Sequence, residues 1–131
     1  MSAQGRFAET SEEVEVRKED QDRINEFGVI HQKLADLAAE RKAIEEVLMN
    51  IEDAEQEVML AEDNDSFLVQ LGSTYVRVGE DEFNEFIEKK RSELDEKMSN
   101  IRSEVDTLDK EKADLKATLY ARFGSTINLE D

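Results

Sequence analysis

The fold of this chain is decided by the stretch SFLVQLGSTYVRV, residues 66–78. Aromatic and β-branched residues are enriched in its two halves, residues 66–71 and 74–78, and the pair between them, Gly72-Ser73, suits a type II′ turn. The stretch therefore predicts a β-hairpin. On both sides of it the apolar pattern changes from a period of two to heptads, so the hairpin stands between two helical stretches.

The expected register places most apolar side chains of the hairpin on one face. That face carries Phe67, Val69, Leu71, Thr74, Val76 and Val78, whereas Gln70 and Arg77 point the other way. A lone two-stranded hairpin is marginally stable in water and exposes two strand edges, and flanking helices can cover only part of its apolar face. We therefore expect it to pair with hairpins of other chains. The expected oligomerisation residues are Phe67, Val69, Leu71, Tyr75, Val76 and Val78.

Two heptad stretches flank the hairpin, residues 20–62 before it and residues 80–123 after it. In the first stretch the two heptad positions carry Phe27, Leu34, Arg41, Leu48 and Glu55, and Ile30, Leu37, Ile44, Ile51 and Val58. In the second, Met98, Val105, Lys112 and Leu119 alternate with Ile87, Leu94, Ile101, Leu108 and Leu115. This spacing is typical of helices that face each other along a seam. The chain is therefore predicted to be mainly α, an antiparallel two-helix coiled-coil hairpin with a single β-hairpin at the bend.

Polar residues interrupt this predicted seam. Folding back at the hairpin places Val58 near Ile87, although the register within a few residues stays open. The polar seam positions are Arg41, Glu55 and Lys112. They either specify the alignment of the helices at some cost in stability or sit at loosened points near solvent.

The ends of the helical stretches mark the predicted domain. Residues 1–19 are expected to form a flexible acidic tail, and residues 20–131 one coiled-coil domain. Acidic residues open the second helix, where the helix dipole favours negative charge, and Gly124 after it is expected to end the helix. Residues 124–131 then form a short C-terminal tail.

Composition limits the kind of protein. The chain has 131 residues, 39% of them charged and 38% hydrophobic, with no Pro or Trp, which favours a long, thin helical protein over a thick globular core. A formal net charge of -17 disfavours binding to nucleic acid. The chain has no Cys, no apolar run of signal-peptide type and no run of about 18 apolar residues. We therefore expect a soluble intracellular protein that does not enter a membrane; cytoplasmic action is expected, and a nuclear role stays open.

An ordered set of segments resembles a known protein family. The segments are Glu19-Asp20-Gln21, Ile24-Asn25 with Phe27, residues 59–63, Gln70-Leu71-Gly72, residues 119–124 and residues 127–130. Together with the layout of two helices around one hairpin, they resemble the β-type subunits of prefoldin, and one eukaryotic subunit in particular, across nearly all of residues 14–131. The single hairpin supports the β-type, because α-type subunits have two.

The resemblance implies an assembly and a function. The assembly is a heterohexamer of two α-type and four β-type subunits, whose hairpins form a double β-barrel from which six coiled coils hang. It holds unfolded clients, notably actin and tubulin, and passes them to the cytosolic group II chaperonin without using ATP itself. In agreement, the sequence contains no Gly-rich phosphate loop. The residues alone leave a second class open, a structural coiled-coil adaptor or scaffold that forms a dimer.

The end of the coiled coil remote from the hairpin is the candidate client site. Its apolar residues are Ile24, Phe27, Leu119, Tyr120, Phe123, Ile127 and Leu129. At a splayed tip these groups would stay exposed and contact hydrophobic segments of an unfolded chain, with several coiled coils adding avidity. Alternatively, the four on the seam only close it; these are Ile24, Phe27, Leu119 and Phe123. The off-seam residues Tyr120, Ile127 and Leu129 are then the stronger candidates. The acidic residues Glu130 and Asp131 are expected to contact the chaperonin, with plain solvation as the alternative.

No catalytic site, metal site or cofactor is expected. Residues 63–65, Asp-Asn-Asp, are similar to the start of a calcium loop, but Phe67 and Leu68 stand where an oxygen ligand and a glycine are needed. His31 is the only histidine, so neither a His-based zinc cluster nor a serine triad can form within the chain. A thin coiled coil offers no cleft that would perturb its many carboxylates. The chain is therefore predicted not to be an enzyme.

Overall fold

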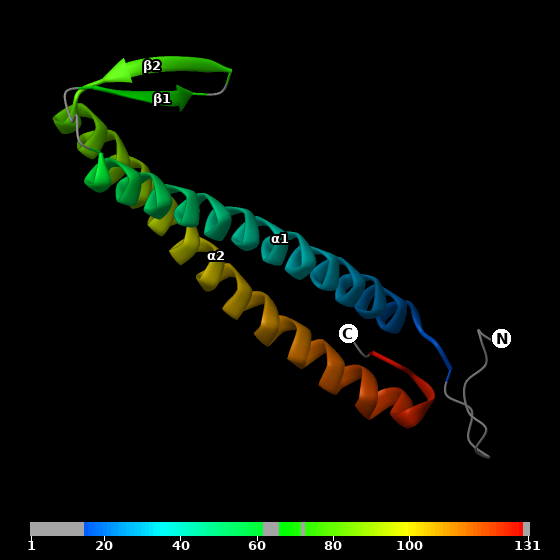
Figure 1. Ribbon diagram of the computed structural model, residues 1–131. Coiled ribbons are helices and arrows are strands. Elements are labelled where there is room, and N and C mark those ends of the chain that lie inside the picture. Colours follow the sequence, from blue (N-terminus) through cyan, green and yellow to red (C-terminus); the bar gives the residue numbers. More distant parts are fainter. Residues whose placement is uncertain (1–14, 62–65, 72, 130–131) are drawn as a thin grey trace. The chain divides into compact units, whose positions relative to one another are not determined.

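Two long helices with a two-stranded antiparallel hairpin between them make up the chain. A computed structural model describes residues 15–61, 66–71 and 73–129. The elements are α1 Lys18–Leu60, β1 Phe67–Leu71, β2 Thr74–Val78, α2 Glu80–Phe123 and the short 3-10 helix η1 Gly124–Thr126 (Figure 1). This order confirms the predicted fold class. Neither long helix in these residues combines the length and the hydrophobicity that crossing a membrane requires.

Helix α1 begins at Lys18 because neighbouring residues satisfy its first backbone groups. The N–H of Arg17 donates to Asp20 Oδ2 at 3.0 Å, which is one half of a capping box. Glu19 and Asp20 also place negative charge in the first turn. Lys18 and Glu19 are thus helical, whereas the sequence placed them in the tail. Residues 15–17 precede the helix without regular structure, and residues 1–14 of the predicted tail lie outside the described residues.

Helix α2 spans the predicted residues, Glu80–Phe123. Its first turn closes when the N–H of Phe83 donates to the carbonyl oxygen of Gly79 at 2.9 Å. At its other end Gly124 has φ +60°, a left-handed conformation that costs glycine little and that ends many helices. Gly124 is therefore the predicted stop, and it turns the chain into η1.

The hairpin has the predicted register. The Cα partners are Phe67↔Val78, Leu68↔Arg77, Val69↔Val76, Gln70↔Tyr75 and Leu71↔Thr74. Because side chains alternate along a strand, the apolar set of β1 shares a face with Thr74, Val76 and Val78, as expected. Gly72, half of the predicted turn, lies outside the described residues.

The contacts divide the chain into two units. We call Met1–Ala38 with Ser103–Asp131 the tip unit, and Ala39–Arg102 the hairpin unit. The tip unit buries Phe27, Ile30, Leu37, Leu108, Leu119, Phe123 and Leu129, and the hairpin unit buries Ile44, Ile51, Phe83, Ile87, Leu94 and Ile101. Most of these residues recur at intervals of seven, so each unit has a core built on the predicted heptads.

One heptad position is covered better than the other. In the hairpin unit Ile44 and Ile51 are buried, whereas Leu48, at the second position, is half-buried and Arg41 is exposed. A seam between two helices has open flanks, so only the side chains aimed at the partner helix are fully covered. Arg41 is accordingly one of the loosened seam points near solvent.

Candidate client and assembly sites

Apolar side chains from both helices and from the C-terminal segment form one cluster in the tip unit. Phe27 of α1 is buried with Leu119 and Phe123 of α2, and Leu119 is 0% exposed. Leu129 of the C-terminal segment completes the buried group. The half-buried residues packed against it are Ile24, Leu115, Tyr120 and Ile127. Since full burial of one such side chain is worth about 1.5–3 kcal/mol, this cluster stabilises the closed tip unit.

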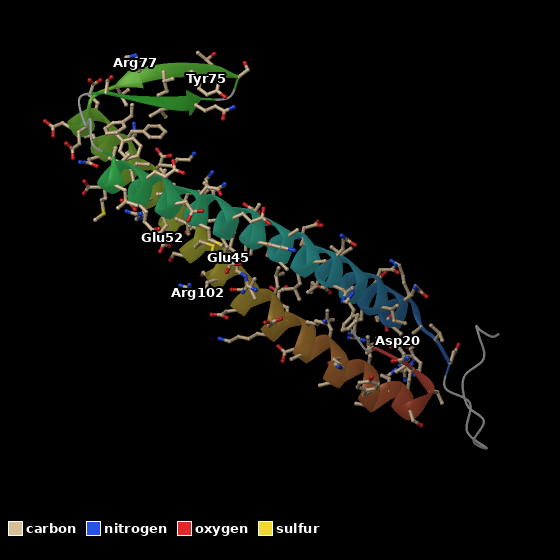
Figure 2. All side chains as sticks on the ribbon, viewed as in Figure 1. Asp20, Glu45, Glu52, Tyr75, Arg77 and Arg102 are labelled. Carbon is tan, nitrogen blue, oxygen red and sulfur yellow. The ribbon has the colours of Figure 1, made fainter. Side chains whose placement is uncertain are left out.

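A bidentate ion pair joins the two helices beside this cluster. Arg122 Nε donates to Asp20 Oδ1 at 3.0 Å, and Arg122 Nη2 donates to Asp20 Oδ2 at 2.6 Å. The same Nη2 donates to the backbone oxygen of Glu15 at 2.7 Å. Two parallel charge-assisted hydrogen bonds fix both the distance and the orientation of the pair. We call this pair the tip clamp; Figure 2 labels Asp20 in the first turns of α1.

Asp20 is charged although it is 1% exposed. The hydrogen bonds from Arg122 lower the pKa of Asp20, and they outweigh the opposing effect of burial; the Arg17 amide and the charges of Arg122 and Arg23 act in the same direction as those bonds. The carboxylate therefore serves both as the cap of α1 and as the anchor of α2. Sequence reasoning did not single out this pair, although Asp20 and Arg122 both lie in the segments that carry the family resemblance.

A cation also covers one aromatic ring of the cluster. Lys112 Nζ lies 5.4 Å from the ring centroid of Phe27. An ammonium group over a ring face is attracted by the ring quadrupole, by about 0.5–1 kcal/mol at an exposed site. Lys112, one of the three polar seam positions, thus has an aromatic partner on the other helix.

The C-terminal segment turns back over the cluster. After η1, the chain drawn in red in Figure 1 runs back from the end of α2 towards α1. Thr126 Oγ1 donates to the backbone oxygen of Phe123, and the N–H of Leu129 donates to the hydroxyl oxygen of Tyr120 at 3.2 Å. Leu129 is thereby buried. The sequence placed it off the seam and exposed, because no periodic pattern after Gly124 reveals where the chain goes.

The tip described here is closed rather than splayed. Of the expected client-binding residues, Phe27, Leu119, Phe123 and Leu129 are buried within the chain, and Ile24, Tyr120 and Ile127 keep partial exposure. Client contact by these residues stays a prediction. Glu130 and Asp131, the expected chaperonin contacts, lie outside the described residues.

The hairpin unit covers one face of its hairpin in part. Phe67 lies against Phe83 of α2, with ring centroids 5.8 Å apart and tilted by 46°. Val69 lines a shallow apolar pocket with Ile51, Phe83 and other residues of the two helices. As a result Phe67, Val69 and Val78 are half-buried. The helices thus cover part of the apolar face of the hairpin, as expected.

Other apolar side chains of the hairpin remain exposed. Leu68 is 60% exposed, Tyr75 63% and Val76 38%, and Figure 2 labels Tyr75 and Arg77 on the hairpin. Sequence reasoning named Tyr75 and Val76 as oligomerisation residues but omitted Leu68. The strand alternation could have found it, because Leu68 and Tyr75 share the face opposite Phe67. The side chain of Leu71 is not among those described.

An ion pair also crosses the seam of the hairpin unit. Arg91 Nη1 donates to Glu55 Oε2 at 3.2 Å, and Arg91 Nη2 pairs with Glu55 Oε1. This hydrogen bonding lowers the pKa of Glu55 and raises the pKa of Arg91, in each case against the effect of burial. Glu55 is a polar seam position, so the pair supports a role in alignment. Its side chains are 36% and 40% exposed, which limits its energy.

Metal-binding geometry is not found in the described part of the chain. Within residues 15–61, 66–71 and 73–129, no group of three or more His, Cys, Asp or Glu could hold a metal ion. Residues 63–65, with their calcium-like start, lie outside these ranges. His31 is exposed on α1.

The order of elements defines the class of protein: a two-helix coiled coil that carries one β-hairpin between its helices. A family described as "Prefoldin subunit" matches residues 21–126. The chain belongs to this prefoldin subunit family, as the sequence segments indicated. Membership implies association with other prefoldin subunits.

Individual relatives agree with this assignment. The chain is 36% identical over 122 residues to "Prefoldin subunit 4" of Bos taurus and, equally, of Homo sapiens, covering 92% of this chain and 90% of each relative. It is 32% identical over 119 residues to "Probable prefoldin subunit 4" of Dictyostelium discoideum, covering 91% of this chain and 90% of the relative. Subunit four is the eukaryotic subunit that the sequence segments resemble.

A solved structure supports the fold independently of sequence. The crystal structure of the prefoldin beta subunit from Thermococcus strain KS-1 superposes with a TM-score of 0.70 at 14% identity. The match covers 84% of this chain and 96% of that chain. At this identity the likeness concerns the fold, which is that of a prefoldin beta subunit.

Proposed function

We propose that this chain is a β-type subunit of a heterohexameric prefoldin-type co-chaperone that captures unfolded polypeptides. The hexamer has two α-type and four β-type subunits, its clients include actin and tubulin chains, and it delivers them to the cytosolic group II chaperonin without hydrolysing ATP. The observation that carries the proposal is the match to the prefoldin subunit family over residues 21–126, which includes both helices and the hairpin.

The exposed surface of the hairpin supports an assembly role. Leu68 and Tyr75 are each at least 60% exposed on one face, and each strand of this two-stranded sheet has one edge without a strand partner in the described residues. Exposed strand edges with large apolar side chains are templates for pairing with another chain. We assign this surface, with the half-buried residues Phe67, Val69 and Val78, to contacts with neighbouring subunits.

The tip unit is the proposed client and chaperonin end. Its cluster combines aromatic and aliphatic groups, and Ile24, Tyr120 and Ile127 keep surface available for apolar contact. Weak contacts of this kind gain strength when several subunits hold one client. Glu130 and Asp131 are the proposed chaperonin contacts. The proposed site of action is the cytoplasm, with the nucleus open, and the proposal contains no catalytic step and no cofactor.

Native mass measurement after mixing with α-type and other β-type prefoldin subunits tests the proposal. We expect a species of six chains that contains this one, and we expect it to suppress the aggregation of unfolded actin diluted from denaturant. A stable dimer of this chain alone, indifferent to such partners, would instead support a structural coiled-coil adaptor. A hexamer that leaves actin aggregation unchanged would retain the assembly role and remove the client role.

A further inference from the structure

We propose that residues 127–129 act as an internal competitor for the client site, so that an unfolded polypeptide binds the tip unit by displacing them. The inference rests on the proposed function, because it concerns how the same end of the molecule takes up a client. It adds the chemical form of the bound segment: an extended stretch with one aliphatic side chain that takes the place of Leu129.

Leu129 is held in the way that a bound peptide residue is held. Its side chain is buried among Phe27, Leu119 and Phe123, which come from two different helices. Its backbone N–H donates to the hydroxyl of Tyr120 at 3.2 Å. An apolar pocket for the side chain with a polar acceptor for the main chain is the usual way in which an extended peptide is recognised.

These contacts of Leu129 require no particular sequence. Any non-proline residue offers a backbone N–H to the Tyr120 hydroxyl, and any aliphatic side chain of similar size fills the position of Leu129. The site therefore suits segments of many unfolded proteins, which expose aliphatic residues that a folded protein would bury. The chain's own Leu129 shows which chemistry the site accepts.

Residues 127–129 can leave the cluster without separating the helices. The tip clamp joins α1 to α2 through Asp20 and Arg122, and none of its hydrogen bonds involves residues 127–129. Lys112 on the ring of Phe27 also joins α2 to α1. Gly124, with φ +60°, provides the turn from which the segment starts. A site whose walls are held by other contacts stays formed when its occupant is exchanged.

When residues 127–129 occupy the site, the apparent affinity for a client is the intrinsic affinity multiplied by the fraction of tips that are vacant. A substitution that weakens the binding of this segment therefore raises the apparent affinity. We expect Leu129→Ser to increase the affinity of the assembled complex for reduced and carboxymethylated α-lactalbumin about tenfold. This probe is permanently unfolded, and as an acidic polypeptide it is not attracted by negative charge. Leu60→Ser is the matched control, because Leu60 is 82% exposed in the hairpin unit. It should leave the affinity unchanged.

Hydrogen exchange in the unaltered complex tests the same idea without a substitution. When the probe binds, a fragment covering residues 125–131 should exchange faster, because the N–H of Leu129 loses its acceptor, while a fragment containing Ile24 and Phe27 should exchange more slowly. Slower or unchanged exchange in the C-terminal fragment would overturn the inference.

The binding results distinguish failure of the internal competitor from failure of client capture. If the unaltered complex binds the probe and Leu129→Ser binds it equally or more weakly, the competitor is refuted and client capture stands. If neither complex binds the probe or actin, both ideas are refuted. Circular dichroism of the Leu129→Ser complex establishes that its helices are retained, and the exchange experiment decides the matter where they are not.

Discussion

The tip unit and the hairpin unit are built from the same two helices, yet the first covers its large apolar side chains and the second leaves several of them exposed. The tip unit covers its aromatic and aliphatic groups with its own C-terminal segment and secures them with the buried carboxylate of Asp20. The hairpin unit leaves Leu68 and Tyr75 exposed and pairs Glu55 with Arg91 at a half-exposed site. Exposed apolar patches mark sites of interaction with other molecules, so the two units differ in how much of their apolar surface is available for such contacts.

Charges placed on the hairpin should abolish assembly of the hexamer. Val69→Asp together with Val76→Asp places two carboxylates on the cross-strand pair at the centre of the hairpin. Assembly would bury these charges without a partner, which costs about 3–5 kcal/mol, so we expect the hexamer to disappear at micromolar concentration. Size-exclusion chromatography with native mass measurement follows assembly, and circular dichroism should show nearly unchanged helical content.

The control for this variant is Ser92→Asp with Ser99→Asp, which adds the same charge at two exposed positions of α2 in the same unit. It should assemble normally. A hexamer that survives the valine changes would place the subunit contacts away from the hairpin.

Removing the charge of Asp20 should destabilise the tip unit to a smaller extent. Asp20→Asn keeps the size of the side chain but removes the charge that accepts both hydrogen bonds from Arg122. Hydrogen bonds to charged groups contribute about 1.5–3 kcal/mol, and the cap of α1 is weakened as well, so we expect a loss of about 2 kcal/mol in the free energy of unfolding. Urea denaturation followed by circular dichroism measures it.

Asp22→Asn is the matched control, since Asp22 is exposed on the same helix two residues away. Its effect should stay within about 0.5 kcal/mol, as for most surface substitutions. Equal losses from the two variants would mean that pairing with Arg122 adds nothing to the effect of a negative charge near the start of α1.

The clamp also predicts how the stability of the tip depends on pH. The pKa of Asp20 is lowered in the folded chain from its ordinary value of 3.8. Its contribution is therefore complete above that value, and it is lost as the pH falls through the lower pKa of the folded state. The difference in unfolding free energy between the unaltered chain and Asp20→Asn should be constant from pH 7 to about 5 and should shrink below pH 3.8. A difference that grows on acidification would contradict this assignment.

Features encoded by local patterns were predictable from the sequence. The period of two around Gly72-Ser73 determines the strand pairing of the hairpin, since a one-residue slip would turn its apolar face over. Heptads predicted both helices, and Gly124 predicted where the second one ends. The two polar seam residues with cross-helix partners were also visible as interruptions of the heptads, at Glu55 and Lys112.

Features that depend on long-range register were not predictable. The partners Asp20 and Arg122 are 102 positions apart, and heptads leave the alignment of two helices open by a few residues. Arg91 as the partner of Glu55 was missed for the same reason. Leu129 follows a glycine in a stretch without periodicity, so its burial depends on tertiary packing alone.

The ion pair of the hairpin unit should contribute less to stability than the tip clamp. Glu55→Gln removes the charge that Arg91 contacts in the hairpin unit, but the Glu55 side chain is 36% exposed and water can take over its role. Half-exposed pairs contribute about 1 kcal/mol or less, so we expect a loss below that value in urea denaturation, against Glu57→Gln as an exposed control on the same helix. Added salt should reduce the loss from Glu55→Gln more strongly than the loss from Asp20→Asn, because screening acts mainly on charges that solvent reaches. If the two variants lose equal free energy and respond equally to salt, the burial of Asp20 does not make its ion pair stronger than that of Glu55. The closure of the tip unit would then rest on its apolar cluster alone.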